Sequence, residues 1–538
     1  MKRKMLALLM TAVLMLCAVC ACGEDASAEE YVISDIDFSR MDAGISADPV
    51  FYEIFVGSFS DSDGDGTGDL RGIISRLDYL NDGDPLSGKS LGVEGIWLTP
   101  VFSSPSYHKY DVTDYYTVDP AFGTNDDLAE LVALCHERGI KVILDLPINH
   151  MSSRGSLFKN FINAHICHNP ANIYYDLFTW IDASADKVPA GRHFTRSPAA
   201  GILYESNFSD DMPELNFDNE KAREMVLDVA LFWLDKGVDG FRFDAAKYIY
   251  YGDNAKSADF WNWYIGELKK VKPDIFTVAE VWDGDGVIMK YAGVLNCFNF
   301  TASQASGIIA ETANKGDVNR FTAYTESCIT SLKALRADAA NVFFIANHDT
   351  DRAAGYLTVA SGNMKTAANL YLLSPGTPFI YYGEEIGLRG SRGGANTDAN
   401  RRLAMLWGDG DTVKDPVGTT YDASKQTPYA VSDLVGKDSS IYTHYKKLLM
   451  LRKANPEIAS GEYHALKLTG TKLGGFTASL NGSVVAVLHN TTQRDMTVDL
   501  NEIEDLPCRL LIDSVGAGEA ELNGTLLTVP GQTSVILR

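Results

Sequence analysis

The segments KVILDLPINH (141–150) and VDGFRFDAAK (238–247) decide the fold. Each opens with a short, almost wholly apolar run and ends in polar residues. Such runs are typical of parallel strands covered on both faces. The sequence contains eight of them, with amphipathic stretches such as 126–138 and 220–236 between most: 51–56, 95–99, 141–146, 238–243, 275–279, 294–298, 342–346 and 378–382. Eight strand–helix units predict an α/β fold, a (β/α)₈ TIM barrel.

Two stretches do not follow the barrel pattern. Residues 151–217 are rich in aromatic residues, Asn, Pro and Ser, which predicts a domain inserted after the third strand. Residues 456–538 contain short alternating strands with Gly, Asn and Thr turns, which predicts a C-terminal antiparallel β-sandwich. The barrel is then built from two parts, 48–150 and 218–455.

The N-terminus has the pattern of an export signal. Lys2, Arg3 and Lys4 precede an apolar run over 5–19, which is short for a membrane span. The run ends in VCACG (19–23), which resembles a bacterial lipobox with Cys22 as the lipidated residue. We therefore expect a signal peptide at 1–21 and an acidic tether at 22–47, with the protein exported and anchored at the cell surface. Plain secretion and an uncleaved anchor are the alternatives.

The charge balance limits the choice of partners. The chain of 538 residues has 47 Lys and Arg against 71 Asp and Glu, a formal net charge of −24. Phosphates of nucleic acid and anionic lipid would be repelled, so we expect no nucleic acid and membrane contact only through the anchor. A neutral partner such as a sugar fits better. Five dispersed cysteines follow the signal, which predicts buried free thiols rather than a zinc site.

Polar residues follow the predicted strands, where barrel enzymes place their chemistry. Strand 3 ends at Asp145 and His150, strand 4 at Arg242, Asp244 and Lys247, strand 5 at Glu280 and Trp282, and strand 7 at His348 and Asp349. Taken singly, each is more often a helix cap, a core residue or a solvated charge. Their shared position at one rim of the barrel favours a site.

Two carboxyl groups of different protonation are what glycosidic cleavage requires. Arg242 and Asp244 lie two apart on one strand, so Arg242 is expected to keep Asp244 ionised and oriented. Glu280 lies between apolar neighbours, which would raise its pKa and keep it protonated as an acid. Asp349, with His348 and His150, could hold sugar hydroxyls.

The segments DLPINH (145–150), GFRFDAAK (240–247), AEVW (279–282) and ANHD (346–349) resemble the four signature regions of the α-amylase family of retaining glycoside hydrolases. GVEGIWLTPVFSSPSYHKYDVTDYY (92–116) and YYGEEIGL (381–388) resemble its strand-2 and strand-8 regions. The resemblance implies that Asp244 is the nucleophile, Glu280 the acid/base and Asp349 the transition-state stabiliser. It also implies that Tyr110, His150, Arg242 and His348 line the sugar site, and that Lys247 reaches the sugar beyond the scissile bond.

The same resemblance narrows the activity. MPELNF (212–217) resembles a motif of a subgroup between oligo-1,6-glucosidases and neopullulanases, and Ala245 after the nucleophile implies α-1,4 specificity. We expect a monomeric α-amylase that hydrolyses α-1,4-glucosidic bonds in starch and maltodextrins with retention. The alternatives are an α-glucosidase or neopullulanase-like enzyme with transglycosylation, and a non-catalytic maltodextrin-binding lipoprotein.

A separate acidic loop follows the first strand. Asp61, Asp63, Asp65, the Thr67 carbonyl and Asp69 occupy positions 1, 3, 5, 7 and 9 of a calcium-type loop, and Gly66 takes position 6. Position 12 is Gly72 rather than Glu, so the loop is not a complete EF-hand. We expect Ca²⁺ at this loop, because four carboxylates within nine residues repel one another without a cation. A solvated acidic turn is the alternative.

Overall fold

The computed structural model describes residues 44–184 and 187–538. The predicted signal peptide, the lipidated Cys22 and most of the tether lie outside these ranges. Within them, no helix is both long enough and apolar enough to cross a membrane.

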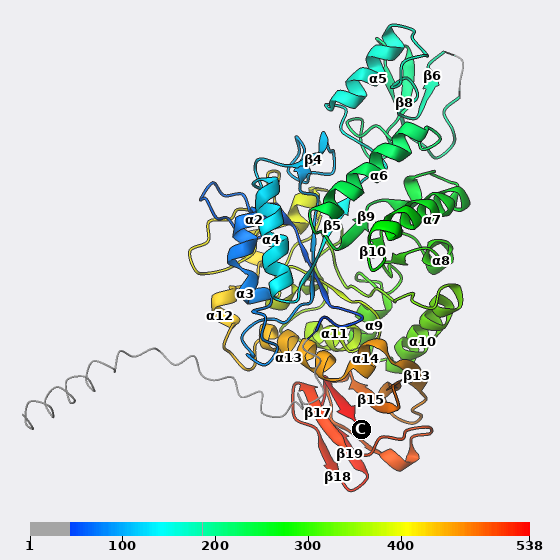
Figure 1. The fold of residues 1–538 in the computed structure, drawn as a ribbon. Helices are drawn as coiled ribbons and strands as arrows, with labels where there is room; N and C mark the ends of the chain where they lie inside the picture. The colour runs from blue at the N-terminus through cyan, green and yellow to red at the C-terminus, as the bar shows by residue number, and fades with distance from the viewer. Residues whose placement is uncertain (1–43, 185–186) are drawn as a thin grey trace, which may run out of the picture.

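A curved parallel sheet forms the centre of the molecule (Figure 1). Its strands lie in the order β11-β10-β9-β5-β2-β1-β12, and all neighbours are parallel. They are buried along almost their whole length, as their apolar sequences require. Their bounds are β1 Phe51–Ile54, β2 Gly95–Leu98, β5 Lys141–Leu146, β9 Gly240–Phe243, β10 Phe276–Ala279, β11 Asn296–Cys297 and β12 Phe379–Tyr381.

The seventh predicted strand, 342–346, is not a regular strand. It makes one parallel bridge, Phe298 to Val342, and its Phe343 carbonyl accepts a hydrogen bond from the Phe379 amide at 2.8 Å. These contacts join it to the chain just after β11 on one side and to β12 on the other. The segment therefore connects the two ends of the sheet, which explains why its side chains are buried although its pairing is too sparse for a ladder.

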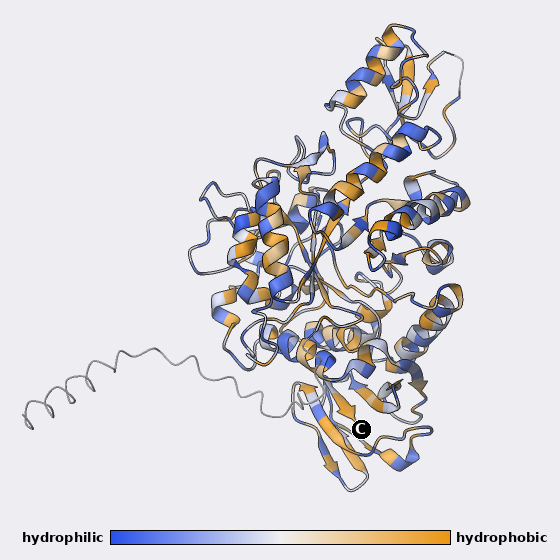
Figure 2. Ribbon diagram, in the orientation of Figure 1, coloured by the Kyte–Doolittle hydropathy of each residue, from blue (hydrophilic) through white to orange (hydrophobic). Residues whose placement is uncertain are grey.

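Amphipathic helices cover the sheet, and Figure 2 shows both hydrophobic and hydrophilic residues along them. The predicted helices at 126–138 and 220–236 are found as α4 and α6. Thr124 and Asp127 form a capping box at the start of α4, and Asn219 caps α6. The helices around the sheet are α2 Leu70–Ser75, α3 Leu77–Leu80, α4 Asn125–Glu137, α6 Glu220–Asp235, α7 Asn254–Val271, α8 Asp285–Ala292, α9 Ile308–Lys315, α10 Val318–Leu335, α11 Asn363–Leu372 and α13 Ile441–Ala454.

The stretch between β5 and α6 projects from one end of the barrel (Figure 1). It contains helix α5 (Ser156–Ile166) and a small antiparallel sheet of β6 (Trp180–Asp182), β7 (Phe194–Ser197) and β8 (Ile202–Glu205). A bridge between His150 and Glu214 ties the two ends of the stretch together. The insert thus begins and ends beside the carboxyl end of β5.

The C-terminal part lies at the opposite end of the molecule (Figure 1) and contains two antiparallel sheets with a separate apolar core. The fold class predicted from the sequence is confirmed, whereas the domain boundaries remain predictions. The strands are β13 Glu462–Leu466, β14 Gly474–Leu480, β15 Ser483–Asn490, β17 Leu511–Gly516 and β20 Thr533–Leu537 in one sheet, and β16 Met496–Asp499, β18 Glu521–Asn523 and β19 Leu526–Val529 in the other.

The cysteines of the described chain are free thiols, as predicted. Cys135, Cys297, Cys328 and Cys508 are buried, but Cys167 is exposed. The expectation of burial was therefore wrong for Cys167, which is the residue that follows α5 in the projecting insert.

Candidate active site

Strand register brings the first polar residues together. Asp145 on β5 pairs with Arg242 on β9, so both side chains point to the same face of the sheet. The approach of β9 to β10 depends on Gly240, because a Cβ at this position would lie 1.8 Å from the Phe276 carbonyl oxygen. A glycine therefore allows the close strand packing from which Arg242 and Glu280 converge.

Arg242 connects three carboxyl groups. Its Nη1 lies 2.7 Å from Asp145 and 2.6 Å from Asp244, and its Nη2 lies 3.0 Å from Glu280. Arg242 is fully buried, and Asp244 and Glu280 are only 7% and 8% exposed. A buried guanidinium is stable only when its charge is paired, so these contacts fix the relative position of Asp244 and Glu280.

The backbone after Asp244 holds Glu280 a second time. The Ala245 amide donates a hydrogen bond to Glu280 Oε2 at 2.9 Å, and the Ala246 amide donates to the Glu280 carbonyl at 3.0 Å. Ala245 has φ +46°, a left-handed conformation that is unfavourable for a residue with a Cβ. The two hydrogen bonds to Glu280 offset the strain of this turn, and they fix the position of the Glu280 carboxyl group.

The environment raises the pKa of both carboxyl groups. Burial, with Asp244 and Asp349 nearby, raises the pKa of Glu280 to about 7, although Arg242 opposes the rise. Burial also raises the pKa of Asp244, and the ion pair with Arg242 again opposes this shift. Glu280 can therefore carry a proton near neutral pH, as the sequence predicted. The guanidinium beside Asp244 is in place to favour its ionised form, but it does not lower its pKa below the usual range.

Asp349 has the opposite character. Burial alone would raise its pKa, but His348 and Arg402 hold the pKa of Asp349 well below the usual range. His348 Nε2 lies 2.9 Å from one carboxylate oxygen, and Arg402 Nη2 lies 2.7 Å from the other. Asp349 is therefore ionised and fixed by two cations at the rim.

The charged form of His348 is favoured by Asp349 and by Glu53 on β1. Its Nδ1 donates to Glu53 at 2.6 Å, and its Nε2 lies 2.6 Å from the Tyr110 hydroxyl, which donates to Asp145 at 2.8 Å. Burial would lower the pKa of His348, but Asp349 and Glu53 raise it to about 10. A continuous chain of hydrogen bonds therefore runs from Glu53 through His348 to Asp349.

A cavity of about 520 Å³ opens above these groups and is called the cleft below. Asp244, Glu280 and Asp349 line it, together with Tyr110 and His150. Its wall also includes Trp282, which is 42% exposed and stacks on Phe300 at a ring distance of 5.1 Å. Trp282 therefore presents an aromatic face to the cleft instead of lying in the core.

The other predicted sugar-site residues are placed differently. His150 donates from Nε2 to the Tyr110 carbonyl at 3.1 Å, and burial lowers its pKa to about 4. The neutral ring leaves Nδ1 as an acceptor without a partner in the described chain. Lys247 donates to the Trp282 carbonyl at 2.8 Å and pairs with Asp283 at 3.1 Å. Lys247 is thus a support under Trp282 and does not itself line the cleft.

Sequence reasoning missed several residues of the site. Glu53 lies inside the predicted strand 51–56, so the rule that located Asp244 and Glu280 just after their strands does not find it. Arg402 and Asp398 belong to a long loop after β12 with no periodic pattern, and only the tertiary structure places them at the cleft. Tyr107, which bonds Arg402 at 3.1 Å, is likewise on a loop.

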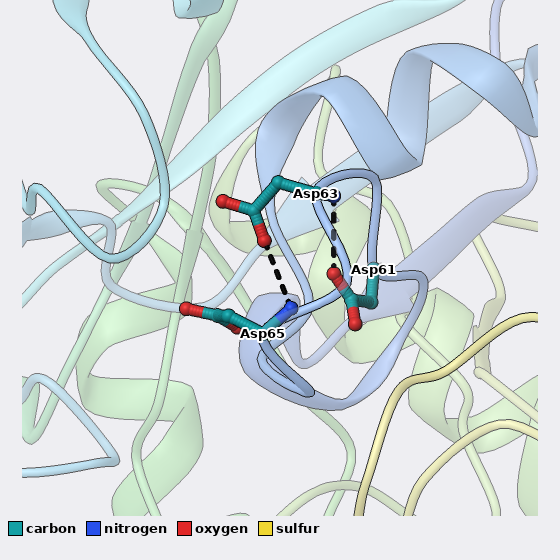
Figure 3. A group of neighbouring side chains, drawn as sticks. All are labelled: Asp61, Asp63 and Asp65. Atoms are coloured by element: carbon teal, nitrogen blue, oxygen red, sulfur yellow. Dashed lines mark hydrogen bonds between the residues drawn. The ribbon is translucent and has the colours of Figure 1, made fainter.

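The acidic loop lies apart from the cleft. Asp61, Asp63 and Asp65 each offer one carboxylate oxygen within 4.8 Å of the others (Figure 3). Three oxygen ligands on a tight loop fit the preference of Ca²⁺ for carboxylates and carbonyls. Asp69 does not join this group: it accepts hydrogen bonds from Ser62 and caps α2 through the Gly72 amide at 2.7 Å.

Thr67 is also in the loop, and its amide donates to Asp65 at 2.6 Å. Backbone amides of Gly64 and Gly66 donate to Asp61, each at 2.8 Å. Burial acts to raise the pKa of Asp61, but these bonds and one from Thr412 lower it overall. The loop therefore keeps at least Asp61 ionised and oriented.

Two buried carboxyl groups that share one guanidinium, at the carboxyl end of a parallel barrel, define the class of the protein as a glycoside hydrolase. The geometry of the Asp244–Glu280 pair would allow one carboxyl group to act as a nucleophile and the other as an acid, and the open aromatic cleft suits a sugar chain.

Comparison with known proteins gives the family. Residues 53–461 match the family described as "Alpha amylase, catalytic domain". The chain is 36% identical to "Alpha-amylase 3" of Dictyoglomus thermophilum, over 84% of this chain and 86% of that protein. It is 30% identical to a cyclomaltodextrinase of Thermoanaerobacter pseudethanolicus, over 88% and 71%. The solved structure of Eubacterium rectale Amy13B superposes with a TM-score of 0.82 at 31% identity, covering 93% of this chain and 97% of that one.

The chain therefore belongs to the α-amylase catalytic domain family. The resemblance predicted from the signature segments is confirmed, and the relatives fit the predicted subgroup. An α-amylase-like activity on α-glucans follows from this membership.

Proposed function

We propose that the protein hydrolyses α-1,4-glucosidic bonds of starch and maltodextrins by a retaining double displacement. The observation that carries the proposal is the attachment of Asp244 and Glu280 to the two terminal nitrogens of one buried guanidinium. Retention needs two carboxyl groups about 5–5.5 Å apart, whereas inversion needs room for a water between them. A shared Arg242 favours the closer arrangement.

Asp244 and Glu280 both act in each of the two displacement steps. In the first, an Asp244 oxygen bonds to the anomeric carbon while the glycosidic C–O bond breaks, and the departing oxygen takes the proton of Glu280. In the second, a water replaces Asp244 at that carbon and gives its proton to Glu280, which restores both groups. Ionised Asp349 stabilises the positive charge that develops on the sugar ring.

The cleft residues suit a glucan. Tyr110 and Trp282 offer rings for the apolar faces of pyranoses, and the free Nδ1 of His150 accepts a hydrogen bond from a hydroxyl. Ala245 after the nucleophile supports α-1,4 specificity, as the family resemblance implies. The cyclomaltodextrinase relative supports a second candidate, a neopullulanase-like or α-glucosidase activity with transfer to a sugar acceptor.

The test follows products by NMR on amylose, pullulan and maltotriose. We expect α-anomeric products from amylose, and transfer products or cleavage of pullulan would favour the second candidate. Activity should fall as pH rises through about 7, because Glu280 must be protonated. Glu280→Gln and Asp244→Asn should lower kcat by about 10⁴-fold or more without unfolding, while exposed Asp274→Asn, which does not line the cleft, serves as the control. Full activity in either variant would refute the assignment, as would initial products of β configuration.

Two further properties belong to the same proposal. Asp61, Asp63 and Asp65, with the Thr67 carbonyl, would hold a structural Ca²⁺ that offsets their repulsion, away from the reacting bond. Export, with anchoring of a monomer through Cys22, suits an enzyme whose polymeric substrate is too large to enter the cell.

A further inference from the structure

A second cavity, of about 650 Å³, lies next to the cleft at the same end of the barrel. It is enclosed by loops that follow β11, the 342–346 segment and β12, and we call it the side cavity. Arg401 lines both cavities. Its guanidinium bonds to Asp351 of the side cavity at 2.8 Å and to Asp398 of the cleft at 3.0 Å.

The side cavity contains hydrogen-bonding groups without partners in the described chain. Arg389 Nε is buried and unpaired, although its Nη1 donates to the Lys425 carbonyl. The side-chain amide of Gln304 and the Tyr421 hydroxyl, both on half-buried residues, also make no hydrogen bond to the described residues, although the Gln304 backbone amide donates to the Ile345 carbonyl at 3.0 Å. Gln304 lines the side cavity and has φ +67°. This left-handed backbone conformation is energetically unfavourable for a residue with a Cβ. Buried polar groups are rarely left unpaired without a reason.

An aromatic ring is available in the same cavity. Tyr421 is half-buried, and no other aromatic ring of the described chain stacks against it. Tyr356 is on the opposite loop and anchors its hydroxyl to the Ile345 carbonyl at 2.7 Å, so its ring is fixed. A ring with free polar groups around it suits a ligand that has both an apolar face and hydroxyls.

Both cations and anions line the side cavity. Asp351 is paired with Arg401, and Asp422 lies 3.9 Å from Lys425. Arg389 makes no ion pair within the described chain, so its guanidinium is available to donate hydrogen bonds to a ligand hydroxyl. Ala305, Gly355 and Asp422 are exposed at the mouth, so a chain can enter from solvent.

We propose that the side cavity is a second carbohydrate site, which binds a short run of glucosyl units that is not cleaved. The ligand class rests on the proposed function, because a glucan is the neutral polyhydroxyl chain that this protein meets. A glucan bound there is kept at high local concentration next to the cleft, which strengthens binding of long chains more than short ones.

The test counts bound maltotriose by calorimetry in the Glu280→Gln background, where the sugar stays intact. We expect two binding events per chain. Tyr421→Ala should remove one or weaken it about tenfold, and Gln304→Gly, which also relieves the backbone strain, should do the same. Tyr429→Ala is the matched control: Tyr429 is 53% exposed on the same loop but does not line the side cavity, so both events should remain.

Catalysis separates this proposal from the proposed function. With Glu280 intact, Tyr421→Ala should raise KM for amylose several-fold and leave kcat/KM for maltotriose unchanged. A single binding event in the Glu280→Gln protein, unaltered by Tyr421→Ala and Gln304→Gly, would overturn the side-cavity site. The failure of the proposed function would show differently, as hydrolysis retained in Glu280→Gln.

Discussion

At the scale of single residues, the site depends on groups that have no direct access to substrate. Glu53 is almost fully buried, and it accepts hydrogen bonds from both Nδ1 and the backbone amide of His348. By holding the charge of His348, Glu53 fixes the proton that His348 shares between Tyr110 and Asp349. It is a positioning residue that acts through His348.

Glu53→Gln tests this role. Its shape is conserved, but His348 loses an anionic partner, so the pKa of His348 should fall from about 10 toward its usual range. We expect kcat to fall between about 10- and 100-fold with little change in KM, because Asp349 loses its fixed position. The alkaline limit of the kcat profile should move to lower pH.

Glu385→Gln is the control for Glu53→Gln, since Glu385 is also buried, and its side chain accepts hydrogen bonds from the hydroxyls of Tyr52 and Tyr79 rather than from His348. A pH profile of Glu53→Gln that matches the wild type would show that Glu53 has only a structural role.

At the scale of elements, the short segment after β12 contains a buried carboxyl group whose protonation affects stability. The 3₁₀ turn Glu384–Ile386 after β12 buries Glu384, which accepts hydrogen bonds from the hydroxyls of Tyr371 and Tyr445. Burial raises the pKa of Glu384 to about 8 from the model-compound value of 4.5. The folded protein therefore keeps a proton there that the unfolded chain releases.

This proton makes stability depend on pH. Because the folded pKa is raised, the contribution of Glu384 is fully present below about pH 4.5 and is lost as pH rises to about 8. Glu384→Gln keeps an acceptor oxygen but does not titrate. Between about pH 4.5 and about pH 8, the free energy of unfolding of the wild type should fall by roughly a few kcal/mol relative to that of Glu384→Gln. Urea unfolding at several pH values measures the difference.

Exposed Glu462→Gln is the control for Glu384→Gln and should follow the wild type at each pH. A difference between the wild type and Glu384→Gln that stays constant with pH would contradict protonation of Glu384 in the folded protein.

The acidic loop is a second element whose stability we expect to depend on conditions, in this case on bound Ca²⁺. If Ca²⁺ binds at Asp61, Asp63 and Asp65, chelation removes a ligand that favours the folded state. At a free concentration 100 times the Kd, the loss is about 2.7 kcal/mol. We expect chelator to lower the melting temperature of the wild type and of exposed Asp84→Asn, and added Ca²⁺ to restore it.

Asp63→Asn should already melt lower than the wild type and respond less to chelator. A wild-type melting temperature that is indifferent to both chelator and Ca²⁺ would leave the loop as a solvated turn.

At the scale of the whole molecule, the C-terminal sheets are bonded firmly to the barrel. Asn369 on α11 donates to the Val515 carbonyl at 3.1 Å and to the Ser534 hydroxyl at 2.9 Å. Asn319 on α10 donates to the Leu468 carbonyl at 2.9 Å. The insert projects at the other end, so the cleft lies between the insert and the barrel rim, where Phe208 and Met212 reach it.

The proposed membrane anchoring concerns the whole chain and is tested at Cys22. Cys22→Ala should release the protein from the membrane fraction into the medium or periplasm, with unchanged activity on soluble maltodextrin, because the cleft is far along the chain. Fractionation with a lipid-labelling assay measures this. Continued sedimentation of the variant with membranes would contradict lipidation at Cys22, and buried Cys135→Ala, which keeps Cys22, should remain anchored.

Seven of the eight predicted barrel strands, and the polar residues that follow them, could be predicted from the sequence, because continuous apolar runs are local patterns and parallel strands place their carboxyl ends at one edge. Asp244, Glu280 and Asp349 could be found in this way. Only the tertiary structure decided that 342–346 is a bridge segment, that Asp69 is a helix cap, and that Glu53 and Arg402 hold His348 and Asp349. These outcomes depend on contacts between residues up to hundreds of positions apart, whose distances and competing hydrogen bonds leave no periodic signal in the chain.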